Sequence, residues 1–274
     1  MPLKIFLSKE KGFCFGVERA VKIVTKIKDR ANTFGQIIHN PQLVQKLEKQ
    51  GKKVVNNLNE VTEKILIIRA HGASDKFIQK AKKRCLKIID LTCPYVKKAQ
   101  VLSANLEKNG YRVIIIGKRN HPEIVSIAEN LNSPIIVENL PQTKKLGFYN
   151  KAGIISQTTF NIQEVDKITA EIKKHAEELK IYKTICDATQ KRQKAAYELA
   201  KKVDTMIIVG GKNSSNTKRL FEICTKIVTS HHIETKNELK ENWFKNKKKV
   251  GVTSGASTPK IILNEVVKTL RKMR

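Results

Sequence analysis

Short apolar runs and longer amphipathic segments alternate along the whole chain. The run Lys4–Leu7 has the length and composition of a β-strand. After it, apolar residues recur at helical spacing from Val17 to Ile27. Later runs such as "VIII" and "MIIV" are followed by polar loops and further amphipathic segments. Strands that alternate with helices predict an α/β fold with mostly parallel sheets and right-handed crossovers.

This alternation occurs three times, and each repeat starts at a cysteine. Cys14, Cys93 and Cys186 each precede an amphipathic segment, and two strands with polar loops follow each of them. The first loops end the segments "GQIIHNPQ", "VIIIGKRNHPE" and "MIIVGGKNSSN", and the second loops end "ILIIRAHGAS", "AGIISQTTFN" and "VGVTSGASTPK". The chain therefore predicts three related α/β units, residues 13–92, 93–185 and 186–274.

The order of strands also predicts a place for the N-terminus. In the first two units a last strand, "LKIIDLTC" or "YKTIC", leads into the next cysteine. The third unit ends in the helical segment "PKIILNEVVKTLRKMR" and lacks such a strand. We expect residues 1–12, with the strand "LKIFL", to complete the third unit. The three units would then be related by a pseudo-threefold axis, with Cys14, Cys93 and Cys186 around it.

Composition restricts the classes of partner. The 274 residues are 40% hydrophobic and carry a formal net charge of +29, but the lysines are spread over nearly every helix and aromatic residues make up only 5%. A nucleic-acid-binding protein would show clustered basic residues interleaved with aromatic ones, so we expect no nucleic-acid partner. The charge favours anionic substrates and acidic protein partners. No signal peptide or membrane-length apolar run is visible, so we expect a soluble cytoplasmic protein.

Each repeat cysteine is a buried structural thiol, a nucleophile or a metal ligand. A helix N-terminus favours the thiolate. Structural zinc takes four ligands, commonly in C-x2-C pairs, and the sequence has none of these pairs. Three equivalent thiolates suit a cubane iron–sulfur cluster with one iron that has no protein ligand and can act as a Lewis acid. Cys85 and Cys224 lie outside the repeat pattern, and we expect them to be structural.

The loops carry mostly neutral hydrogen-bonding side chains. Such groups at helix N-termini bind phosphate, although N-capping of the helix is the alternative role for each of them. Glu123 is the only carboxylate among them, and it either interacts with the helix dipole or donates a proton. Together, the loops and cysteines suggest reductive removal of a hydroxyl from a small phosphorylated molecule. The other loop residues are His39, Asn40, His71, His121, Thr158, Thr159, Ser214, Ser215, Asn216 and Ser257. We expect His175, His231 and His232, outside the loops, to lie at the surface.

Nine successive motifs resemble those of the 4-hydroxy-3-methylbut-2-enyl diphosphate reductase family. From residue 12 to about 263 they read "GFCFGVERAV", "HNPQLV", "AHGAS", "DLTCPYV", "GKRNHPE", "SQTTF", "ICDAT..RQ", "GGKNSSNTKRL" and "GVTSGASTP". The resemblance implies three α/β domains around one oxygen-sensitive 4Fe–4S cluster, with Cys14, Cys93 and Cys186 as its ligands. It also implies the last step of non-mevalonate isoprenoid synthesis. In that step two electrons and two protons remove the C4 hydroxyl, giving isopentenyl and dimethylallyl diphosphate.

The resemblance further implies roles for the loop residues. Glu123 matches the proton-relay carboxylate, Thr158 the threonine on the hydroxyl side, and His121 takes part in both catalysis and binding. The implied electron donor is ferredoxin or flavodoxin, both of which are acidic. Quinolinate synthase remains an alternative because it has a similar three-unit plan and three cysteine ligands, although its motifs do not match these loops. The positions matching the diphosphate contacts are His39, His71, His121, Ser214, Asn216 and Ser257, with Ser215 close by.

Overall fold

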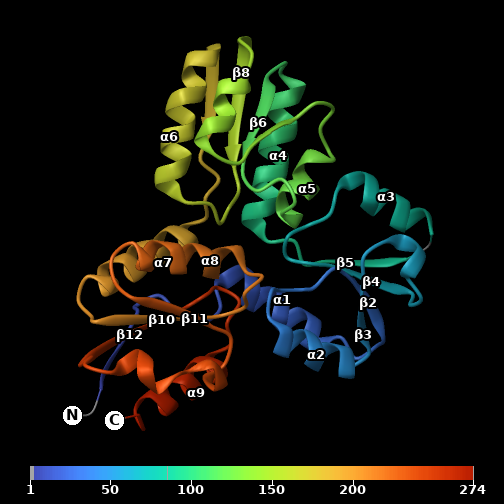
Figure 1. Ribbon diagram of the computed structural model, residues 1–274. Helices are drawn as coiled ribbons and strands as arrows, with labels where there is room; N and C mark the ends of the chain where they lie inside the picture. The colour runs from blue at the N-terminus through green and yellow to red at the C-terminus, as the bar shows by residue number, and fades with distance from the viewer. Residues whose placement is uncertain (1–2, 85, 274) are drawn as a thin grey trace. The chain divides into compact units, whose positions relative to one another are not determined.

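The computed structural model describes residues 3–84 and 86–273, and Cys85 lies outside this part of the chain. It contains three parallel sheets of four strands each, with the orders β5-β4-β2-β3, β9-β8-β6-β7 and β1-β12-β10-β11 (Figure 1). The other three strands of each sheet follow one common order, and the edge strand is the last of its unit in the first two sheets but the N-terminal strand β1 in the third. The predicted α/β fold with parallel sheets is therefore confirmed.

The strands and helices have the following bounds. The strands are β1 (Lys4–Leu7), β2 (Ala31–Phe34), β3 (Lys52–Val55), β4 (Ile65–Ile68), β5 (Lys87–Asp90), β6 (Arg112–Ile116), β7 (Ile135–Val137), β8 (Tyr149–Ser156), β9 (Ala176–Tyr182), β10 (Thr205–Val209), β11 (Ser230–Ile233) and β12 (Lys249–Ser254). The α-helices are α1 (Phe15–Lys26), α2 (Pro41–Lys49), α3 (Asp75–Lys83), α4 (Pro94–Lys108), α5 (Pro122–Ala128), α6 (Ile162–Ile172), α7 (Asp187–Ala200), α8 (Ser215–Thr225) and α9 (Lys260–Leu270).

The N-terminal strand lies at the edge of the third sheet. β1 pairs in parallel with β12, from Lys4 opposite Lys249 to Leu7 opposite Val252. β5 has the same place beside β4, and β9 beside β8. The strand that precedes each repeat cysteine therefore forms the corresponding edge of a sheet.

Helices cover both faces of the second and third sheets. The second sheet packs against α6 on one face and against α4 and α5 on the other (Figure 1). The third sheet packs against α9 on one face and against α7 and α8 on the other. Sheets buried on both faces have apolar strands, which explains the near-continuous isoleucine and valine runs of β6 and β10.

The chain divides into two compact units. The first comprises Met1–Glu18, Ile38–Val44 and Asp187–Arg274, and contains the third sheet. The second comprises Arg19–Ile37 and Gln45–Cys186, and contains the other two sheets. The boundaries 13–92, 93–185 and 186–274 stay a prediction from the repeats.

Two predicted strands are displaced. The first central strand is Ala31–Phe34, not the run "GQII" that follows it, because Gly35 has a φ of +69° and ends the strand. Asn32 is buried despite its polarity, and its side-chain oxygen accepts hydrogen bonds from the backbone N–H groups of Thr62 and Glu63. β9 ends at Tyr182, so most of the run "YKTIC" is a connection to Cys186 rather than a strand.

The residues expected to be structural or exposed have mixed outcomes. Cys224 is fully buried, and burial raises the pKa of its thiol to about 12, so the structural prediction is confirmed. His231 and His232 are partly buried on β11, contrary to the expectation of surface residues. The His231 ring stacks on Trp243, with centroids 3.9 Å apart, and His232 Nε2 lies 2.8 Å from the Gly210 carbonyl.

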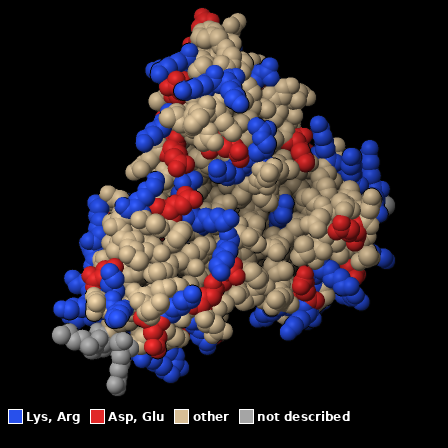
Figure 2. All heavy atoms as spheres, viewed as in Figure 1, with Lys and Arg blue, Asp and Glu red and all other residues tan. Residues whose placement is uncertain are grey.

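Charge is distributed over the surface rather than gathered in one place. Figure 2 shows lysine and arginine side chains over all parts of the visible face, with acidic side chains between them. Across residues 3–84 and 86–273, no helix combines the length and the apolar character needed to cross a membrane.

Candidate functional site

The three repeat cysteines occupy equivalent places at helix starts. Cys14 directly precedes α1, Cys93 is the N-cap of α4, and Cys186 directly precedes α7. All three thiols are partly exposed, and none is in a disulfide. A helix N-terminus stabilises a thiolate, which is the form that binds metal. These positions therefore fit metal ligands better than inert core thiols such as Cys224.

Backbone hydrogen bonds fix each cysteine in the same way. The N–H of Cys14 donates to the Ala256 carbonyl over 3.1 Å, and that of Cys93 to the Ala70 carbonyl over 2.9 Å. The N–H of Cys186 donates to the Thr158 carbonyl over 3.1 Å. Each acceptor lies in the polar loop after the neighbouring strand, β12, β4 or β8. Every cysteine is thus tied to a loop that carries a candidate site residue.

Glu123 is a buried carboxyl held by a single threonine. Its Oε1 accepts the backbone N–H of Thr158 and its Oε2 accepts the Thr158 hydroxyl, both over 2.7 Å. Burial raises the pKa of Glu123 to about 7, although the two hydrogen bonds from Thr158 act in the opposite direction. A carboxyl with this pKa carries a proton in a large share of molecules at neutral pH, as a general acid requires.

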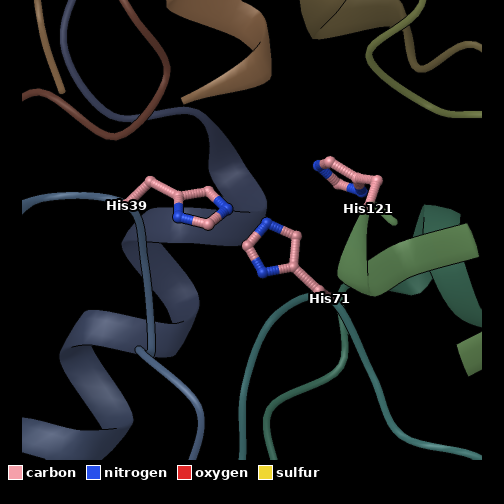
Figure 3. Close-up of side chains that lie close together, drawn as sticks. All are labelled: His39, His71 and His121. Carbon is pink, nitrogen blue, oxygen red and sulfur yellow. The ribbon is translucent and has the colours of Figure 1, made fainter. Parts of the chain in front are cut away.

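Two histidines of the second compact unit, His71 and His121, lie near Glu123. His121 is the N-cap of α5, and its Nδ1 accepts the backbone N–H of Glu123 over 3.2 Å. The His71 and His121 rings are nearly perpendicular, with centroids 5.3 Å apart (Figure 3). The Ser126 hydroxyl lies 3.0 Å from the His71 carbonyl and 2.8 Å from the Glu123 carbonyl. The structure thus brings His71, His121, Glu123 and Thr158 together.

The first compact unit contains a second group of candidate loop residues: His39, Ser214, Ser215, Asn216 and Ser257. Ser214 is the N-cap of α8 and accepts the Thr217 N–H over 3.3 Å, while Ser215 is partly exposed in the first turn. Ser257 donates its hydroxyl hydrogen to the His39 carbonyl over 3.1 Å. Asn216 is 4% exposed, and within the described chain neither its amide nitrogen nor its oxygen has a hydrogen-bond partner.

An unpartnered buried amide is costly to the folded protein and calls for a reason. At the N-terminus of α8, an anionic ligand would satisfy the donor of Asn216. The residues present in the first unit therefore fit a bound phosphate group.

Sequence reasoning did not identify several residues that position these loops. A Cβ atom on Gly211 would lie 2.6 Å from the His39 carbonyl oxygen, so only glycine allows this approach. Gly255 packs in the same manner on Thr217, where a Cβ would lie 2.0 Å from the hydroxyl oxygen. Ser126 was also missed, because a serine three residues after Glu123 resembles any small helix residue. The pairs "GG" and "SG" at strand ends were the available signal.

The chain is similar to a known protein family over almost its entire length. The profile of the family described as LytB protein matches residues 5–271. The chain belongs to this family.

Curated relatives of this LytB chain carry one enzyme name. A protein of Geobacter metallireducens is 40% identical, and the match covers 99% of this chain and 98% of that protein. A protein of Campylobacter hominis is 43% identical, and the match covers 99% of this chain and 100% of that protein. Both are named 4-hydroxy-3-methylbut-2-enyl diphosphate reductase. We therefore assign the chain to the oxidoreductases.

Solved structures agree with this assignment. A structure of (E)-4-hydroxy-3-methyl-but-2-enyl diphosphate reductase, described as the terminal enzyme of the non-mevalonate pathway, is 38% identical with a TM-score of 0.71. The match covers 98% of this chain and 99% of the chain in that structure. The Plasmodium falciparum reductase is 33% identical with a TM-score of 0.92, covering 98% of this chain and 88% of its own. The match favours the LytB reductases over the quinolinate synthase alternative.

Proposed function

We propose that this LytB chain reductively removes the C4 hydroxyl of 4-hydroxy-3-methylbut-2-enyl diphosphate. The products are isopentenyl diphosphate, dimethylallyl diphosphate and water. One C–O bond breaks, one C–H bond forms, and two electrons and two protons enter. The observation that carries the proposal is the buried Glu123–Thr158 pair, because the pKa of Glu123 suits proton delivery at neutral pH. The reaction belongs in the cytoplasm, where thiols stay reduced.

Cys14, Cys93 and Cys186 would hold one 4Fe–4S cluster per chain. Three observations support these cysteines as ligands: each lies at the start of a helix, each thiol is partly exposed, and their backbone N–H groups make equivalent hydrogen bonds. When bound, such a cluster supplies electrons and an iron without a protein ligand that acts as a Lewis acid.

Glu123 and Thr158 would deliver the proton to the leaving hydroxyl. The backbone N–H of Thr158 holds Glu123 Oε1 in place, which leaves Oε2 to carry the proton. A threonine hydroxyl rotates, so Thr158 can accept this proton while it donates its own hydrogen to the substrate oxygen. His121 fixes the backbone of Glu123 through Nδ1 and so positions the relay.

The diphosphate would bind to loop residues at helix N-termini. The support is that Ser214, Ser215 and Asn216 begin α8 and that the buried amide of Asn216 has no partner in the described chain. The remaining proposed contacts are His39, His71, His121 and Ser257.

Turnover with a chemical reductant tests this function. Under anaerobic conditions, we expect the iron-loaded protein and reduced methyl viologen to convert the hydroxylated diphosphate to the two isoprenoid diphosphates. Mass spectrometry of the products identifies them. Iron-loaded protein that consumes no substrate would contradict the proposed reaction. Ferredoxin or flavodoxin is the proposed physiological donor because each is acidic and this chain is strongly basic.

A further inference from the structure

An open hollow of about 560 Å³ flanks Cys93 in the second compact unit. Thr92 and Pro94, the residues on either side of Cys93, both line it. Arg19 of α1 also lines the hollow, and its guanidinium donates to the Thr92 carbonyl over 3.4 Å. The hollow is therefore one residue along the backbone from a proposed cluster ligand.

The lining combines cations with an apolar surface. Lys97 and Lys98 project from the start of α4 and are exposed, and Val101 on the next turn is 51% exposed. Lys97 has only a weak exposed ion pair with Asp75, at 3.9 Å. The one acidic lining residue, Asp90, uses Oδ1 to accept the N–H and the hydroxyl of Thr92. The hollow thus offers a net positive rim around an apolar centre.

We propose that this hollow is the docking surface for an acidic one-electron carrier protein, and that electrons enter the enzyme beside Cys93. The inference rests on the proposed function, because only a reductive reaction needs such a carrier. Each encounter oxidises the carrier by one electron and reduces the enzyme by one, so two encounters supply one turnover. No covalent bond changes at this surface, and the protons and the departing water belong to the substrate reaction. A carrier with carboxylates around its redox centre complements the rim, and opposite charge accelerates its encounter.

A second hollow provides a matched control. It has a volume of about 440 Å³, lies in the first compact unit and is lined by Lys191, Lys194 and Leu199 among others. Lys191 and Lys194 project from a helix, α7, beside apolar residues, and the charged residues Lys9, Glu10, Glu198 and Lys202 also line this hollow. Unlike the first hollow, it has no lining residue directly adjacent to a proposed cluster ligand. Reversing two lysine charges at each hollow changes the net charge of the protein equally. A difference in carrier affinity between the two variants therefore reports docking at one hollow rather than an effect of net charge.

Binding to an acidic ferredoxin tests the surface without turnover. We expect Lys97→Glu with Lys98→Glu to weaken the affinity for oxidised ferredoxin about tenfold at low salt. Lys191→Glu with Lys194→Glu should change it less than about twofold. Glutamate near a helix N-terminus is favourable, so the first double variant should keep α4 folded, and circular dichroism checks this. Parental affinity in the first variant, or an equal loss in the control, would overturn the proposal.

Turnover supplies the second readout. In the Lys97→Glu, Lys98→Glu enzyme, the KM for ferredoxin should rise about tenfold, while turnover driven by methyl viologen stays at the parental rate. A ferredoxin KM equal to that of the parent would again overturn the docking surface. If the parent shows no viologen-driven turnover, the proposed function fails, whereas the binding measurement still decides whether this surface takes the carrier.

Discussion

Glu123 and Asn216 are both buried polar side chains, but within the described residues only Glu123 has hydrogen-bond partners for its polar side-chain atoms. Thr158 donates to both carboxyl oxygens of Glu123, whereas neither polar atom of Asn216 has a partner. The first arrangement holds a proton-bearing group in place, and the second leaves hydrogen-bonding capacity for a ligand. At the scale of single residues, we therefore expect substitutions of Glu123 and of Asn216 to have different effects.

We expect Glu123→Gln to lose turnover by about 10²–10⁴-fold with the chemical reductant, because general acid catalysis contributes roughly this much. Glutamine keeps the size of the side chain, so cluster loading and substrate affinity should survive. In the parent, turnover should fall as the pH rises through about 7, since the proton leaves Glu123 there. Near-parental turnover in cluster-loaded Glu123→Gln would show that the proton comes from another group.

The raised pKa of Glu123 also predicts a pH-dependent stability difference. Between pH 4.5, the ordinary value, and about 7, the folded protein keeps the proton that the unfolded chain has lost. The contribution of Glu123 to the free energy of unfolding therefore falls as the pH rises through this window, by about 3 kcal/mol in total. Glutamine does not titrate, so Glu123→Gln should gain stability relative to the parent over the same range. Urea denaturation at pH 5, 6, 7 and 8 measures the difference, and a constant difference would refute the raised pKa.

Asn216→Ala should weaken diphosphate binding without destabilising the protein. One hydrogen bond to a charged group contributes about 1.5–3 kcal/mol, or roughly tenfold to a hundredfold in affinity. Removing an unpartnered buried amide should leave the free energy of unfolding unchanged or higher. Asn161→Ala is the matched control, because the buried Asn161 caps α6 through the Glu164 N–H, and its loss should cost about 1 kcal/mol of stability but no affinity. Calorimetry and denaturation give both quantities, and an Asn216→Ala protein with parental affinity would exclude this contact.

At the scale of elements, glycines decide how closely the loops approach. The contact between Gly211 and the His39 carbonyl leaves no room for a Cβ atom, and Gly255 meets Thr217 in the same way. Gly211 is the second residue after β10 and Gly255 is the first residue after β12, where the polar loops begin. The loop geometry therefore depends on small residues that do no chemistry themselves.

Gly211→Ala should move the His39 loop and lower diphosphate affinity about tenfold, with a loss of about 1–3 kcal/mol in stability from overpacking. Gly147→Ala is a control, since its Cβ would meet nothing closer than the Tyr149 side chain at 3.8 Å. Substrate affinity and urea denaturation of both variants check the prediction. Equal affinities in the two variants would mean that the His39 loop does not take part in binding.

The sequence predicts the repeating elements well because apolar strands and polar loops follow each other in the same order three times. It misplaces β2 because buried Asn32 serves as a hydrogen-bond acceptor for a neighbouring loop, and composition does not reveal such burial. It proposes Asn216 and Ser214 together but cannot separate a capping residue from a ligand residue. That distinction depends on hydrogen-bond partners, which only the folded chain shows: Ser214 accepts the Thr217 N–H, whereas Asn216 has no partner in the described chain.

At the scale of the whole molecule, one structural plan is used three times. Each of the three sheets has an edge strand that leads to a cysteine, and each cysteine is held by the carbonyl of a polar loop. On the face visible in Figure 2, basic side chains are spread over all parts of the molecule, with acidic side chains between them. The repetition accounts for three equivalent thiols in a chain that shares the fold of the LytB reductases.

The most direct test of this account is the iron and sulfide content of anaerobically purified cysteine variants. The parent should hold about four irons and four sulfides per chain. Cys14→Ser, Cys93→Ser and Cys186→Ser should each lose stable cluster loading, while Cys224→Ala, which removes a fully buried thiol, should keep it. Full iron and sulfide content in any of the three serine variants would contradict the assignment of these cysteines as the cluster ligands.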